Sequence, residues 1–125
     1  MQGVIIAAGG NGGSGNNTGG FGAGGGAGGY LGLGRTPIVI PGTSGTSATF
    51  TVTVGSSTPR GPSVPNQHYE MRNGQPTTIT DGYGLAIACA VGGGHGGSYF
   101  NGVFVTAGQG GSGGGGNSSG STVSA

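Results

Sequence analysis

The stretch GGFGAGGGAGGYLGLG (residues 19–34) decides how this chain can fold. Glycine loses more backbone freedom on folding than any other residue, and it has no side chain to bury. A glycine-rich stretch is therefore either a flexible linker or a segment that packs closely because its side chains are missing. Two observations favour close packing. Aromatic residues interrupt the glycines at Phe21 and Tyr30, and strand-like sequence flanks the glycine-rich blocks.

The glycines of the two glycine-rich blocks, residues 9–34 and 92–116, recur every three residues. One register of the first block holds positions 10, 13, 19, 22, 25, 28 and 34, and one register of the second holds 93, 96, 108, 111 and 114. Three residues is the period of the polyproline-II helix, which has no internal hydrogen bonds. Several such helices can pair their backbone groups side by side if the facing positions lack a Cβ. The spacing therefore predicts packed polyglycine-II helices.

The rest of the composition explains why backbone has to replace a hydrophobic core. Only 22 of the 125 residues are Val, Ile, Leu or Phe, which is below the roughly 20% at which an ordinary core becomes doubtful. The chain has three Arg, no Lys and two acidic residues, too little charge to keep a disordered chain solvated. The same balance argues against a nucleic-acid partner. No apolar run is long enough for membrane insertion, and a secretory signal pattern is missing at the start.

Strand-like segments flank and separate the two blocks. Within residues 48–55, apolar side chains at positions 50, 52 and 54 alternate with Thr at positions 49, 51 and 53, which is typical of a half-buried strand. The other predicted strands are residues 4–8, 84–91 and 101–108, and residues 37–42 hold a short apolar run bounded by prolines.

Turn signals divide these segments. The Asn-Gly pair at Asn73 predicts a β-hairpin, the Asp-Gly pair at Asp81 predicts a turn, and bends are expected at residues 16–18 and 30–31. No helical periodicity occurs. The sequence predicts a mainly β fold with polyglycine-II helices, in which short strands and packed glycine-rich segments alternate without an α-helix. We expect one domain at residues 1–116 and a flexible Ser/Gly tail at residues 117–125.

Few side chains could carry chemistry. His68 and His95 are the only histidines, and His95 has no Cys, Asp or Glu at metal-ligand spacing. Glu70 and Asp81 are not paired in the sequence, and no nucleophile motif occurs. Cys89 lies in an apolar strand, where we expect it to be buried. We therefore expect no enzymatic activity, no cofactor, and no catalytic or metal-binding residue.

Surface contacts are the remaining route to function. The loop at residues 57–67, with its continuation to Arg72, holds most of the few functional side chains of the chain, namely Arg60, His68, Tyr69, Glu70 and Arg72. Aromatic residues beside glycine segments either form a shallow site for saccharide or protein, or seal the ends of the core. The candidate contact residues are Arg60, His68, Tyr69, Arg72, Tyr30, Tyr99 and Phe100.

The order of motifs along the chain resembles the glycine-rich domain of bacteriophage tail and fibre proteins. The motifs are VIIAAGG (residues 4–10), GAGGYL (26–31), TFTVTVG (49–55), GQPTT (74–78) and AVGGGHGG (90–97). In part the chain also resembles the polyglycine-II adhesins at the fibre tips of T-even-like phages. These resemblances imply a virion structural protein that contacts other virion proteins. For the adhesins they imply a bacterial surface receptor, either a saccharide or an outer-membrane protein.

We therefore expect a non-enzymatic structural protein on the exterior of a phage or virus, as a fibre, tip or capsid-decorating domain that contributes to host-surface adhesion. The small apolar area and the unpaired backbone groups of outer glycine segments predict a homo-oligomer. Its location would be the virion exterior or the extracellular space. Two alternatives stay open, namely an ice-binding polyglycine-II protein and a flexible glycine-rich extracellular structural protein.

Overall fold

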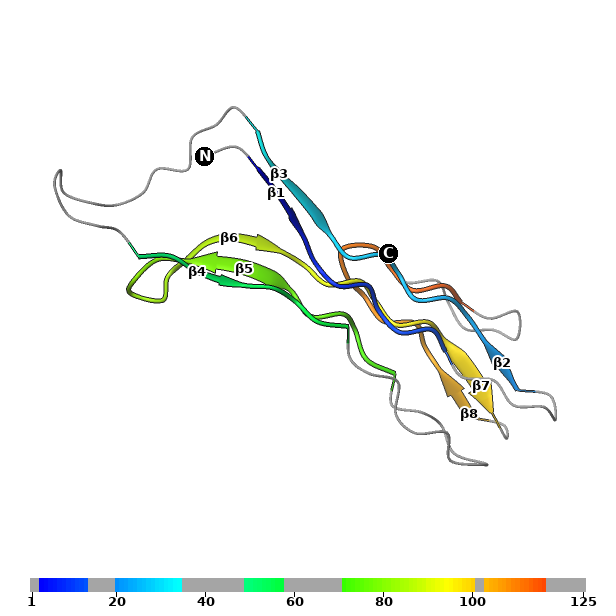
Figure 1. The fold of residues 1–125 in the computed structure, drawn as a ribbon. Coiled ribbons are helices and arrows are strands. Elements are labelled where there is room, and N and C mark those ends of the chain that lie inside the picture. The colour runs from blue at the N-terminus through cyan, green and yellow to red at the C-terminus, as the bar shows by residue number, and fades with distance from the viewer. Residues whose placement is uncertain (1–2, 14–19, 35–48, 58–70, 101–102, 117–125) are drawn as a thin grey trace, which may run out of the picture.

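The computed structural model describes residues 3–13, 20–34, 49–57, 71–100 and 103–116. Within these ranges the chain forms short strands and extended glycine-rich segments that run side by side along one axis (Figure 1). No α-helix occurs in them, so the mainly β fold is confirmed for this part of the chain. The strands are β1 (Gly3–Ile6), β2 (Phe21–Gly22), β3 (Tyr30–Leu33), β4 (Thr51–Thr53), β5 (Thr77–Thr80), β6 (Ala86–Ala90), β7 (Ser98–Phe100) and β8 (Val103–Val105).

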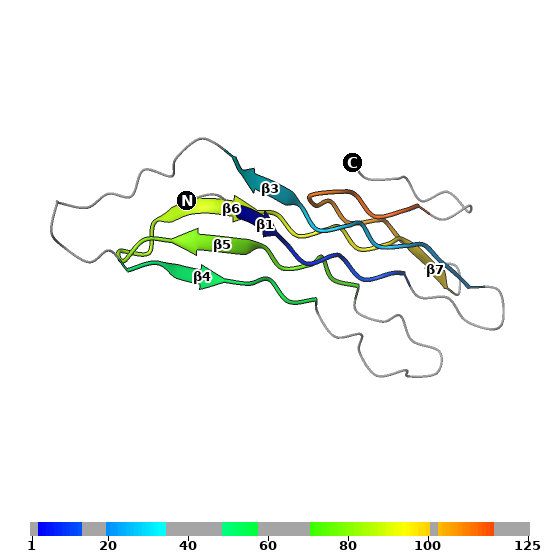
Figure 2. The same cartoon turned by 45° about the horizontal axis from the view of Figure 1, so that its top comes forward.

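Three small antiparallel sheets lie at the two ends of the bundle. The β1-β3 sheet and the β4-β5-β6 sheet occupy one end, where β1 packs against β5 and β6. The β2-β7-β8 sheet occupies the opposite end (Figures 1 and 2). Glycine-rich segments connect the ends: residues 23–29 join β2 to β3, and residues 91–97 join β6 to β7.

The pairing of β1 with β3 continues into the glycine-rich segments without a change of register. In the sheet, Ile6 is the partner of Tyr30. Beyond it, each step to the next hydrogen bond advances three residues on both segments. The bonds are Ala7 N–H to Gly29 O (3.0 Å), Gly10 N–H to Gly26 O (2.9 Å) and Gly13 N–H to Ala23 O (2.6 Å). One antiparallel pair of segments thus changes from the two-residue repeat of a strand to a repeat of three.

The other strand pairs extend in the same way. Beyond β2 and β7, the N–H groups of Ala23, Gly26 and Gly29 donate to the carbonyls of Gly97, Gly94 and Val91. Beyond β7 and β8, Gly108 and Gly111 donate to His95 and Gly92, and beyond β5 and β6, Gly74 donates to Gly93. The three-residue spacing of the glycines therefore reappears as the spacing of the backbone hydrogen bonds. The polyglycine-II conformation of each segment stays a prediction.

Residues 91–97, the central segment, form the core of this bundle. Ten backbone hydrogen bonds join the central segment to five others, residues 7–13, 23–29, 71–76, 107–111 and 112–116. Its glycines at 92, 93, 94, 96 and 97 are all buried. A network of backbone bonds, each contributing about 1 kcal/mol net, occupies the place where most proteins bury apolar side chains.

Glycine is required in the bundle because the segments approach too closely for a Cβ. A Cβ at Gly10 would overlap the carbonyl oxygen of Gly94, and a Cβ at Gly94 would overlap that of Gly108. By contrast, a Cβ at Gly24 would meet nothing within 4 Å. The other positions at which a Cβ would collide with backbone include Gly13, Gly25, Gly26, Gly28, Gly74, Gly92, Gly93, Gly96 and Gly114.

A small side-chain core lies where the two sheets meet at one end of the bundle. Ile5, Ala7 and Ala90 are buried there, with partly buried hydrophobic residues packed against them. Those residues are Leu31, Leu33, Ile79 and Ala88. Alternation along β1 explains why Ile5 points inward while its neighbours Val4 and Ile6 stay exposed.

Strands predicted at residues 4–8, 48–55, 84–91 and 101–108 are confirmed by β1, β4, β6 and β8. The apolar run at residues 37–42, the bend predicted at 16–18 and the tail predicted at 117–125 lie outside the described residues.

The hairpin turn predicted at Asn73 is wrong. Residues 71–76 are extended, because the N–H of Gly74 donates to Gly93 (2.8 Å) in the central segment. The turn that joins β5 to β6 lies instead at residues 81–85, where the predicted Asp-Gly turn is confirmed. Asp81 Oδ1 accepts the N–H groups of Tyr83 and Leu85, and Gly84 has a positive φ of 83°.

Two further predictions are corrected. The bend expected at residues 30–31 is the start of β3, because Tyr30 and Leu31 pair in register with β1. Cys89 is exposed rather than buried. The alternation of β6 directs Ala88 and Ala90 toward the core, so the intervening cysteine faces outward.

Candidate interaction surfaces

The contact residues expected from the sequence do not form one site. Tyr30 is 71% exposed in β3, whereas Tyr99 lies in β7 at the opposite end of the bundle (Figure 1). Arg72 is exposed in the extended segment at residues 71–76. Phe100 is described only as the last residue of β7. Arg60, His68 and Tyr69 lie outside the described residues.

An aromatic row crosses the β2-β7-β8 sheet. Phe21 on β2 is the register partner of Tyr99 on β7, which is in turn the partner of Phe104 on β8. Residues directly opposite each other on neighbouring strands share one face of a sheet. Phe21 and Phe104 are 51% and 49% exposed, and the rings of Tyr99 and Phe104 lie 4.5 Å apart between centroids. We call Phe21, Tyr99 and Phe104 the aromatic row.

Only Tyr99 of the aromatic row was among the predicted contact residues. The aromatic character of Phe21 and Phe104 is visible in the sequence. Their alignment with Tyr99 depends on which strands become neighbours, and β2 and β7 are separated by residues 23–97, which give no local signal of that pairing.

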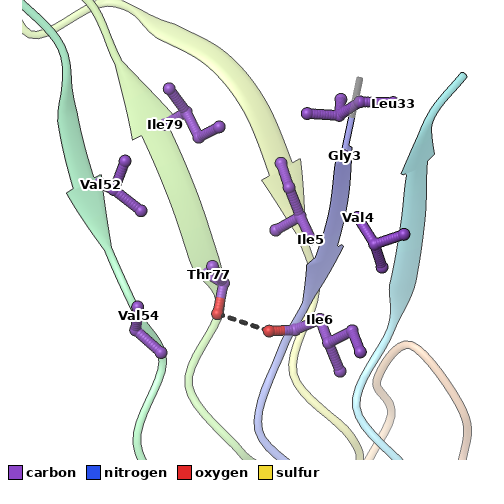
Figure 3. A pocket seen from close by; sticks show the side chains of 9 residues that line it. All are labelled: Gly3, Val4, Ile5, Ile6, Leu33, Val52, Val54, Thr77 and Ile79. Carbon is purple, nitrogen blue, oxygen red and sulfur yellow. Dashed lines mark hydrogen bonds between the residues drawn. The ribbon is translucent and has the colours of Figure 1, made fainter. Parts of the chain in front are cut away.

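An apolar groove of about 360 Å³ opens at the other end of the bundle, between β1, β4 and β5 (Figure 3). Val4 and Ile6 of β1, and Val52 and Val54 across the groove, are each more than half exposed. β1 pairs only with β3 among the described strands, so its second edge borders this groove. The groove is lined by Gly3, Val4, Ile5, Ile6, Leu33, Val52, Val54, Thr77 and Ile79.

The polar side chain in the groove already has its partners. The hydroxyl of buried Thr77 donates to the carbonyl oxygen of Ile6 (2.8 Å) and accepts the N–H of Gly55 (2.9 Å) (Figure 3). This hydroxyl ties β1 to the β4-β5 pair, and among the described strands β1 has no backbone pairing with β4 or β5. The groove therefore offers a partner mainly aliphatic contact, since none of the described residues that line it is charged.

The side-chain amide of Asn73 takes the place of a peptide group in the bundle. Its Oδ1 accepts the N–H of His95 (3.0 Å), and its Nδ2 donates to the carbonyl oxygen of Gln109 (2.8 Å). An amide side chain offers the same donor and acceptor as a peptide unit. Asn73 thereby joins residues 71–76 to the central segment and to residues 107–111. His95 contributes its backbone here, and its Nδ1 lies 3.2 Å from the carbonyl oxygen of Gly96.

The described part of the chain holds no group of three or more His, Cys, Asp or Glu residues that could bind a metal ion. In the same ranges, no helix has the length and hydropathy to cross a membrane.

Comparison with known proteins gives one match. A family described as glycine-rich domain matches residues 2–125, which is nearly the whole chain. No curated protein matches the chain, and no solved structure matches it either.

Proposed function

The chain belongs to the glycine-rich domain family, and we propose that it is a non-enzymatic structural protein on the exterior of a phage or virus. In this proposal it acts as a fibre, tip or capsid-decorating domain, contacts other virion proteins and further copies of itself, and contributes to adhesion at the host surface. The motif order described above supports the virion setting.

The observation that carries the structural role is the central segment with its ten backbone hydrogen bonds to five neighbours. Such bonds fix the segments along their whole length and leave few side chains inside the bundle. An enzyme needs convergent titratable groups in a cleft, whereas a rod of backbone holds the surfaces at its two ends a fixed distance apart. A structural protein needs such a fixed spacing between the surfaces that it presents.

The two ends of the bundle differ in a way that suits two kinds of contact. Permanent interfaces are more hydrophobic than transient ones, so we assign assembly with another copy to the aliphatic groove. Aromatic side chains combine apolar faces with polar edges and dominate exposed contact sites. We therefore assign contact with a surface receptor, a saccharide or an outer-membrane protein, to the aromatic row.

Two matched double variants test the proposal on the purified chain. V52T/V54T makes the groove polar while retaining β-branched residues on exposed positions. We expect it to lower the mass of the protein in solution and to leave binding to bacterial cells unchanged. Y99A/F104A removes two members of the aromatic row and should weaken cell binding without a change in mass. Thermal unfolding of both variants serves as the control for folding.

If the unmodified chain neither assembles nor binds to any strain in a bacterial panel, the proposal is wrong. An ice-recrystallisation assay on the same sample tests the alternative function as an ice-binding protein. If the chain inhibits ice recrystallisation and does not bind to bacterial cells, the ice-binding function replaces the proposed role.

A further inference from the structure

Two Asn-Gly pairs lie in the described part of the chain, Asn11 with Gly12 and Asn73 with Gly74. Such pairs are chemically unstable. The backbone nitrogen of the glycine can attack Cγ of the asparagine, lose its proton, and expel the side-chain nitrogen as ammonia. Water then opens the resulting succinimide to Asp or isoaspartate. Glycine favours the reaction because no side chain hinders the attacking nitrogen.

The fold holds Asn73 and Gly74 in an arrangement that opposes this reaction. The attacking nitrogen of Gly74 already donates its hydrogen to the carbonyl oxygen of Gly93 (2.8 Å), and Gly74 is buried. The side-chain amide of Asn73 is bonded at both of its polar atoms, to His95 and Gln109. Three hydrogen bonds must therefore open before the nitrogen of Gly74 can reach Cγ.

The pair at Asn11 is restrained far less. Gly12 is exposed, and its N–H donates to no acceptor among the described residues. The side chain of Asn11 makes no hydrogen bond within those ranges. The backbone of Asn11 makes two described bonds, because its N–H donates to the carbonyl oxygen of Arg72 (3.2 Å) and its carbonyl oxygen accepts the N–H of Gly96 (2.8 Å). Of these two, the bond to Gly96 opposes the reaction, because rotation of the peptide between Asn11 and Gly12 moves the Asn11 carbonyl oxygen.

We propose that Asn11 is a site of spontaneous deamidation in the folded protein, whereas Asn73 is protected by the fold. The difference of two hydrogen bonds predicts that Asn11 reacts about 30-fold faster than Asn73 in the native state. In the unfolded chain both asparagines precede glycine without these restraints, so their rates should become similar.

Modification of Asn11 would alter the bundle at a sensitive position. Isoaspartate inserts one additional carbon into the main chain between the bonds of Asn11 and the following bond from Gly13 to Ala23 (2.6 Å). The three-residue register of residues 7–13 would then be interrupted. Either product also places a carboxylate on a segment that has no charged side chain.

Peptide mapping of the unmodified protein tests this inference. The folded chain is incubated in mildly alkaline buffer, sampled over time, denatured, and cleaved after arginine. Cleavage after Arg35 and Arg72 places Asn11 and Asn73 in separate peptides, and fragmentation distinguishes Asn73 from other asparagines in its peptide. We expect deamidation of Asn11 well before Asn73 in buffer and comparable rates at both sites in concentrated urea.

The variant G12A provides a matched control. A Cβ at Gly12 would lie 3.5 Å from the carbonyl oxygen of Ala23, an ordinary contact, so the fold should persist while the reaction at Asn11 slows. Equal rates at the two sites in the folded protein would overturn the inference. A deamidation rate at Asn11 that the G12A substitution leaves unchanged would also overturn it.

Discussion

Substituting Gly94 by alanine should destabilise the fold strongly, although it adds only one methyl group. Gly94 lies in the middle of the central segment, where its Cβ would overlap the carbonyl oxygen of Gly108. Neither group belongs to a flexible side chain, so a backbone segment has to move. Moving it disturbs hydrogen bonds on several sides of Gly94. These are Gly94 N–H to Ser112 O (2.9 Å), Gly26 N–H to Gly94 O (2.7 Å) and Gly108 N–H to His95 O (2.8 Å).

The expected loss follows from these bonds. Three net contributions of about 1 kcal/mol each amount to about 3 kcal/mol. The lower backbone entropy of alanine in the unfolded chain offsets roughly 0.4–1 kcal/mol of this loss. We therefore expect G94A to lower the free energy of unfolding by about 2–3 kcal/mol. Urea titration followed by far-ultraviolet circular dichroism measures this value, with the slope compared between variants to verify two-state unfolding.

G24A is the matched control for this prediction. Its Cβ would meet nothing within 4 Å, and Gly24 does not have a positive φ. The entropy term then acts alone, and G24A should stabilise the protein by about 0.4–1 kcal/mol. Substitution by alanine is thus expected to lower the free energy of unfolding at Gly94 and to raise it at Gly24. Equal stabilities for G94A and G24A would refute the idea that close backbone approach holds the bundle together.

Three further predictions concern side chains. T77V should lower the free energy of unfolding, measured by urea titration, by about 2–4 kcal/mol, because the Ile6 carbonyl and the Gly55 N–H lose their buried partner. T77S keeps the hydroxyl and should lower it much less. N73L should lower the free energy of unfolding by about 2–3 kcal/mol in the same titration, since both hydrogen bonds of the Asn73 side chain disappear. A loss below about 0.5 kcal/mol, as at an ordinary surface position, would contradict the bridging role of Asn73. Exposed Cys89 should react with a thiol reagent in the folded protein nearly as fast as in the unfolded chain, and C89S should change stability by at most about 0.5 kcal/mol.

Local patterns in the sequence were sufficient to predict half of the described strands, namely β1, β4, β6 and β8. The Thr-Val alternation around β4 and the apolar run at β1 follow the two-residue repeat of a strand, which depends only on neighbouring residues. The glycine spacing likewise predicted where segments approach closely, because a missing Cβ is visible in the sequence itself.

Positions that depend on distant partners were not predicted. Asn73 and Gly74 carry a hairpin signal, but the bond from Gly74 to Gly93 outweighs it and keeps this segment extended. Cys89 was expected to be buried because the whole of β6 is apolar, and only pairing with β5 decides which face is inside. The aromatic row depends on the same kind of information, since its three strands are distant in the sequence.

A bundle with one continuous register limits how such a chain can change its length during evolution. Loss or gain of a single codon within residues 7–13 would displace every later donor from its acceptor, while a change of three would carry each donor to the next equivalent position. Such a change also has to be matched in residues 23–29 and in the central segment, which share the same bonds. Natural variants should therefore differ inside the bundle by multiples of three residues, introduced in several segments together.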